Sequence, residues 1–109
     1  MDHTKTRQMK KHVIETVTFR GKDGVAESEF LAAAERATAF MTACAGFLRR
    51  RLSRQNDGTW IEHVEWASLE DAKAAAAAIG TDERARAFVR AIDGPSVAMA
   101  HSELAISVG

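Results

Sequence analysis

Residues 46–72, GFLRRRLSRQNDGTWIEHVEWASLEDA, predict a β-hairpin that runs directly into a capped helix. The hairpin strands are expected over 47–54 and 59–67, which contain apolar, aromatic and β-branched side chains. The pair Asp57-Gly58 between them favours a turn, because glycine adopts a positive φ without steric cost. We therefore expect these two strands to be antiparallel neighbours in one sheet.

The helix after the hairpin starts at a capping signal, Ser68, with Asp71 three residues later as an approximate capping box. It continues through residues 72–78, which are all alanine except Lys73, and stops at Gly80, so the second helical region is broken in two. Apolar periodicity and β-branched runs indicate the remaining elements. These are a strand over 12–19, a helix over 27–44, a short helix over 82–92 capped by Thr81, and a strand over 96–108.

The resulting order, β-α-β-β-α-β, is the ferredoxin-like arrangement of the α+β class, with helices on one face of an antiparallel sheet. The first strand carries Val13, Val17 and Phe19 on one side and Ile14 on the other. A sheet with apolar side chains on both faces needs a second cover, which the sheet of a second subunit can supply. We therefore expect a homodimeric α+β barrel.

Length and composition restrict the classes of partner. The chain of 109 residues corresponds to one domain, expected over 12–109, and the polar, basic residues 1–11 are expected to form a disordered leader. The 15 basic and 15 acidic residues give no net charge, which argues against a nucleic-acid partner. No apolar run approaches the roughly 18 residues of a membrane span. The single cysteine rules out an internal disulfide and fits a reducing, cytoplasmic setting.

Short motifs are spread over residues 12–105. They are Glu15 within the first strand, Gly46-Phe47, Arg51-Leu52, Asp57-Gly58-Thr59-Trp60, Trp66-Ala67-Ser68-Leu69-Glu70-Asp71-Ala72, Ile92-Asp93 and Met99-Ala100-His101-Ser102-Glu103. The set resembles the dimeric α+β barrel superfamily, and within it the antibiotic biosynthesis monooxygenase-like domains of small bacterial proteins. The resemblance implies a homodimer and, for some relatives, oxidation of polyphenolic substrates without a metal, flavin or other cofactor.

The candidate catalytic residues are Glu15 and His101. In a ferredoxin-like sheet the first strand lies between the third and the fourth, and residues of equal parity share one face. Glu15 can therefore approach Glu62 or Trp60 on one neighbour and His101 or Met99 on the other, with the register left open by the sequence. If the faces agree, Glu15 and His101 lie side by side in a half-buried site lined by aromatic residues. A carboxylate beside an imidazole fixes the tautomer of the ring, and such a pair can act as a general base on a phenol or an activated carbon. The alternative is a buried Glu–His ion pair that only holds the strands together.

The candidate substrate-binding residues are Trp60, Trp66 and Met99, which would form the wall of a pocket for a flat aromatic ligand. The two tryptophans are six residues apart and share a face of their strand, so packing in the core or the dimer interface is the alternative. His63 lies on the opposite face, and a metal site formed by His63, His101 and a carboxylate lacks tight ligand spacing. No metal is expected.

The remaining reactive and charged residues have structural interpretations. The arginines at 49–51, together with Arg54, predict a solvated strand with some pairing between subunits. Cys44 is expected to be a small core residue at the end of the first helix rather than a nucleophile.

Two functions of different classes follow. The first is an enzyme, a cofactor-independent monooxygenase in which His101 is the base, Glu15 orients it, and the tryptophans form the pocket wall. The second is a non-catalytic dimeric module that binds a small ligand or serves as an accessory or stress protein. A haem-degrading relative is disfavoured, because that class resembles this fold but uses a helical histidine as iron ligand, and no histidine lies between Leu69 and Ile92.

Overall fold

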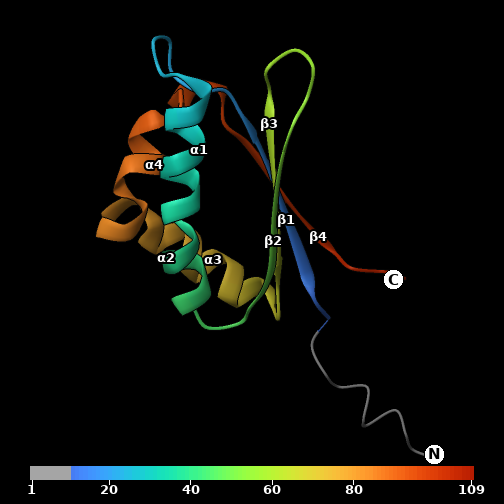
Figure 1. Cartoon of the computed structure of the whole chain (residues 1–109). Coiled ribbons are helices and arrows are strands. Elements are labelled where there is room, and N and C mark those ends of the chain that lie inside the picture. Colours follow the sequence, from blue (N-terminus) through green and yellow to red (C-terminus); the bar gives the residue numbers. More distant parts are fainter. Residues whose placement is uncertain (1–10) are drawn as a thin grey trace, which may run out of the picture.

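The computed structural model describes residues 11–109 as one antiparallel sheet of four strands with all its helices on one face (Figure 1). The strands are β1 (Val13–Phe19), β2 (Phe47–Arg54), β3 (Trp60–Trp66) and β4 (Ala98–Glu103), in the spatial order β2-β3-β1-β4. The helices are α1 (Glu27–Arg36), α2 (Thr38–Ala43), α3 (Leu69–Ala78) and α4 (Arg86–Ala91). Short 3-10 turns lie at Ile79–Thr81, Glu83–Ala85 and Gly94–Ser96. The ferredoxin-like α+β class and the broken second helical region are confirmed.

The predicted leader over 1–11 lies outside the described residues except for Lys11. Among the residues that the structure describes, no helix is long and apolar enough to cross a membrane.

Three expected boundaries are wrong in detail. The helix expected over 27–44 breaks at Ala37 into α1 and α2. The cap of the last helical region is Asp82 rather than Thr81, because the Asp82 side chain accepts a hydrogen bond from the backbone N–H of Arg84 at 2.9 Å. The strand expected over 96–108 is confined to β4, since its pairing partner β1 begins at Val13, directly opposite Glu103.

The core lies between the sheet and the helices and is rich in aromatic rings. Phe30 of α1 stacks on Trp60 of β3, with ring centroids 4.9 Å apart. Phe88 of α4 meets Phe19 of β1 edge-on at 5.8 Å. These contacts bring α1 and α4 against the end of the sheet that carries Phe19 and Trp60. The helix α3 follows the opposite end of β3. It is capped by Ser68, whose hydroxyl oxygen accepts a hydrogen bond from the backbone N–H of Asp71.

None of the described helices covers the other face of the sheet (Figure 1). That face mixes apolar and polar side chains, among them Ile14, which is buried, and Ile61, His63 and Glu65, which are half-buried. The second sheet that would stack on this face in a dimer remains a prediction.

Gly46 sets the position at which α3 starts. Its φ of +79° lies in the left-handed region, and a Cβ added there would collide with the side chain of Asp71, in the first turn of α3. We expect Gly46→Ala to lower the free energy of unfolding by about 2–5 kcal/mol, the sum of roughly 1–2 kcal/mol for the backbone conformation and 1–3 kcal/mol for the clash. Denaturant unfolding with Gly80→Ala as control checks this, because a Cβ at Gly80 meets nothing within 4 Å. Equal stability of the two variants would contradict the role given to Gly46.

Candidate functional site

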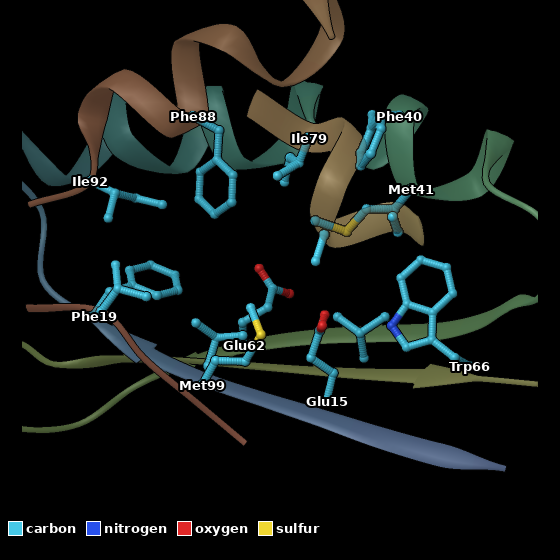
Figure 2. Close-up of a pocket in the computed structure, with 15 residues that line it drawn as sticks. Glu15, Phe19, Phe40, Met41, Glu62, Trp66, Ile79, Phe88, Ile92 and Met99 are labelled. Atoms are coloured by element: carbon cyan, nitrogen blue, oxygen red, sulfur yellow. The ribbon is translucent and has the colours of Figure 1, made fainter. Parts of the chain in front are cut away.

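The sheet, α2, α3 and α4 enclose a cavity of about 130 Å³ (Figure 2). Its wall is almost entirely apolar, and only three of the lining side chains carry a nitrogen or oxygen atom: Glu15, Glu62 and Trp66. The apolar lining residues are Val17, Phe19, Phe40, Met41, Val64, Ala75, Ala76, Ile79, Phe88, Ile92, Val97 and Met99. Such a cavity, apolar with a few converging polar groups, is the usual form of a small-molecule site.

The cavity opens beside the edge strand β4. Two of its lining residues, Met99 and Val97, are 48% and 42% exposed, so they mark the mouth. The opposite end is closed by Val64 and Trp66, which are 1% and 2% exposed. A ligand that enters past Met99 therefore moves toward the middle of β3 and the two carboxylates.

Glu15 and His101 lie directly opposite each other on β1 and β4. The Nε2 atom of His101 is 2.9 Å from Oε2 of Glu15. An ionised carboxylate only accepts hydrogen bonds, so Nε2 carries the proton in this contact. Glu15 is 8% exposed and lines the cavity, whereas His101 lies beside it on the edge strand β4 and is not among the lining residues. Of the pair, the carboxylate is therefore the group that meets a bound ligand.

The second carboxylate of the cavity, Glu62, is held by Arg50 of β2. Arg50 donates from Nε to Oε2 at 2.7 Å and from Nη2 to Oε1 at 2.9 Å. It also donates to the carbonyl oxygen of Ala34 at 2.6 Å and to Thr38 Oγ1 at 2.8 Å, on either side of the break between α1 and α2. Both oxygens of Glu62 are thus engaged. Within residues 11–109, Oε1 of Glu15 has no such partner, which leaves Glu15 as the carboxylate able to accept a proton from a ligand.

Arg50 corrects the expectation of a solvated arginine strand. Its side chain is only 9% exposed, whereas Arg49 and Arg51 on either side are exposed. The cause is a register shift between Phe47 and Arg49, which changes the parity of β2 so that Arg50 and Leu52 face the helices. No residue pattern in this strand signals that irregularity.

Trp66, one of the lining residues, carries an unused hydrogen-bond donor. The residue is 2% exposed, and its Nε1 has no partner among the described residues. Figure 2 draws this nitrogen on the side of the ring turned toward Glu15. A buried N–H without an acceptor costs roughly 1–3 kcal/mol, so a ligand oxygen placed here would be bound favourably.

The structure brings four of the five candidate residues together and leaves one apart. Met99 and Trp66 line the cavity with Glu15, and His101 contacts Glu15. Trp60 is not among the lining residues, because it is buried in its stack against Phe30.

The other reactive side chains do not join the site. His63 lies on the opposite face of β3 from Glu62 and Val64, and therefore across the sheet from the cavity. Within residues 11–109, no group of three or more His, Cys, Asp or Glu residues could hold a metal ion. Burial raises the pKa of the Cys44 thiol above its usual value, and the residue packs against the hydrophobic core, as expected of a structural cysteine.

Comparison with known proteins places the fold. No family model and no curated protein match the sequence. Among solved structures, SnoaB, a cofactor-independent oxygenase from Streptomyces nogalater, is 23% identical with a TM-score of 0.64, over 91% of this chain and 96% of that one. A candidate antibiotic biosynthesis monooxygenase from Bordetella bronchiseptica is 13% identical with a TM-score of 0.75, over 89% and 100% of the two chains.

A heme-degrading protein from Mycobacterium tuberculosis is also similar, at 20% identity and a TM-score of 0.60, over 92% of this chain and 98% of that one. At these identities the likeness concerns the fold and not the reaction. The chain therefore has the ferredoxin-like fold of the antibiotic biosynthesis monooxygenase-like proteins, as its sequence motifs predict.

Proposed function

We propose that this protein is a cofactor-independent monooxygenase that oxidises a small aromatic or polyphenolic substrate in the cavity beside Glu15. One observation carries the proposal: a buried carboxylate, hydrogen-bonded to His101 at 2.9 Å, presents its other oxygen to an apolar cavity that opens at β4. A base in such a place can take a proton from a phenol while the wall excludes water. SnoaB, a cofactor-independent oxygenase of the same fold, is consistent with this chemistry.

The proposed reaction needs no reductant other than the substrate. The phenol proton moves to Glu15, and the resulting phenolate carries electron density at a ring carbon that bears hydrogen. Molecular oxygen bonds to that carbon, and the O–O bond then breaks. One oxygen atom leaves as water with the hydrogen of that carbon and the proton that Glu15 returns, which restores the carboxylate. The other oxygen remains as a carbonyl, so a phenol and O₂ give a quinone and H₂O. His101 is a positioning residue that holds the carboxylate through its Nε2–H.

Oxygen consumption by the purified chain tests this proposal, with a panel of electron-rich phenols. Ala76 lines the cavity yet is exposed, so Ala76→Phe should narrow the site without disturbing the core. Ala77 is exposed as well but is not among the lining residues. We expect Ala76→Phe to reduce turnover roughly tenfold or more and Ala77→Phe to leave it near that of the parent protein. Turnover lost equally in both variants, or no oxygen uptake with any phenol, would contradict the proposal.

The alternative, a non-catalytic module, predicts saturable binding of a phenol without oxygen uptake. We further propose that the chain forms a homodimer through the face of its sheet that no described helix covers (Figure 1), where Ile61 is half-buried. Light scattering measures the mass directly, and a mass of one subunit would contradict the dimer.

A further inference from the structure

We infer that the ligand of this cavity is a neutral molecule with a single aromatic ring and two oxygen substituents, such as a dihydroxybenzene. The inference rests on the proposed function, because it names the substrate class for the same site. It is carried by the volume of the cavity and by the number and kind of polar groups in its wall.

The volume suits one ring. The cavity measures about 130 Å³. An apolar cavity of roughly 150 Å³ in another protein holds benzene, so this space accommodates a ring of that size and little more. A second fused ring would have to displace the closed end or project past Met99 and Val97 into solvent. The rings of Phe19, Phe40 and Phe88 and the thioether of Met41 in the lining suit contact with an aromatic face.

The polar groups of the wall favour a ligand with two oxygen atoms, one that accepts a hydrogen bond and one that donates a hydrogen bond. Trp66 Nε1 is the only hydrogen-bond donor among the lining side chains, and it has no acceptor among residues 11–109. Glu15 offers a carboxylate oxygen that needs a donor. A ligand satisfies both when one of its oxygens accepts from Trp66 and a hydroxyl group donates to Glu15. A hydrocarbon satisfies neither, and a ligand with one oxygen must leave a buried polar group unpaired or serve both with the same atom.

The charges of the cavity wall disfavour the binding of an anionic ligand. The lining contains two carboxylates, Glu15 and Glu62, and no cationic side chain. His101 and Arg50, which contact these carboxylates, are not among the lining residues. A ligand carboxylate would therefore enter an apolar space next to two acidic groups with only one N–H to bind it.

Binding is measured without turnover by titrating the full chain with probes under anaerobic conditions and following the indole N–H signals by NMR. The sequence contains two tryptophans, so Trp66→Phe assigns their two signals. Hydroquinone is expected to bind saturably and to shift the Trp66 signal. We expect 1,5-dihydroxynaphthalene and the anion 2,5-dihydroxybenzoate to bind roughly tenfold more weakly or worse. Equal or tighter binding of either comparator, or no saturable binding of hydroquinone, would overturn the inference.

Two variants separately test the size of the ligand that the cavity accepts and the role of the Trp66 N–H donor. Ile79 lines the cavity, so Ile79→Ala should improve the binding of the two-ring probe relative to hydroquinone, whereas Val89→Ala, a truncation outside the lining, should not. Trp66→Phe keeps an aromatic ring without the N–H and should weaken hydroquinone binding roughly three- to tenfold. Oxygen uptake is scored apart from binding. Hydroquinone that binds without uptake contradicts the proposed enzyme alone, whereas larger rings that bind tightly and are oxidised contradict the single-ring ligand alone.

Discussion

Replacing Glu15 with glutamine is expected to lower kcat for phenol oxidation roughly 10²–10⁴-fold, the usual contribution of a positioned general base. The amide keeps the shape of the side chain and can still accept a hydrogen bond from His101, so the strands stay paired. It cannot take up the phenol proton, because a neutral amide is a very weak base. The affinity for a neutral phenol should change far less than kcat, since the amide oxygen still accepts a hydrogen bond from the hydroxyl group.

Steady-state oxygen consumption with parent, Glu15→Gln and Glu103→Gln separates these effects. Glu103 is an exposed carboxylate on β4, two residues beyond His101, and its loss should leave kcat unchanged. His101→Gln should lower kcat less than Glu15→Gln does, because the histidine acts only through the carboxylate. An unchanged kcat in Glu15→Gln would remove Glu15 from the mechanism. A rise in KM with constant kcat would make it a binding residue instead.

Replacing Arg50 with methionine is expected to lower the free energy of unfolding by about 3–5 kcal/mol, because it leaves Glu62 as a buried carboxylate without its partner. The pair is well shielded, with side-chain exposures of 9% for Arg50 and 5% for Glu62. The same change also removes the donors to Ala34 and Thr38, where α1 meets α2. Denaturant unfolding at one fixed protein concentration measures the effect, which avoids a contribution from association.

Two comparisons show whether the isolated charge is the cause. Arg51→Met alters the exposed neighbour and should change stability by less than about 0.5 kcal/mol. The double variant Arg50→Met with Glu62→Leu removes both charges and should recover much of the loss, as buried pairs replaced by apolar side chains often do. If the double variant is no more stable than Arg50→Met alone, the lost hydrogen bonds at the α1–α2 break, rather than the unpaired carboxylate, account for the change.

The strands, the hairpin and the start of α3 could be predicted from local sequence patterns, and so could the choice of Glu15 and His101 as candidate site residues. Asp57-Gly58 and the Ser68 cap signal the hairpin and the start of α3 through turn and cap chemistry that depends on only a few neighbouring residues. The ferredoxin-like order makes the strands of Glu15 and His101 neighbours, whereas the register that pairs the two residues is given by the structure alone.

What could not be predicted depends on irregular backbone and on packing between distant segments. The register shift in β2 turns Arg50 inward and has no local signature. Trp60 shares the helix-facing side of β3 with Trp66 but is kept from the cavity by Phe30 of α1, a contact that sequence spacing does not encode. The cavity itself is the space left by side chains from several elements, so neither its volume nor its mouth could be read from the chain.

The helix α3 contributes an alanine-rich wall to the cavity, so the residues that shape the space for a ligand lie on a different element from the residue proposed for proton transfer. The proposed base stands on β1 and its positioning residue on β4, whereas Ala75 and Ala76 of α3 contribute only methyl groups to the cavity. Substitutions along one helix can therefore reshape the space for a ligand while the contact between Glu15 and His101 stays as it is. A lineage with this fold can diversify what it accepts through changes in α3 alone, and a designer seeking altered selectivity would begin there.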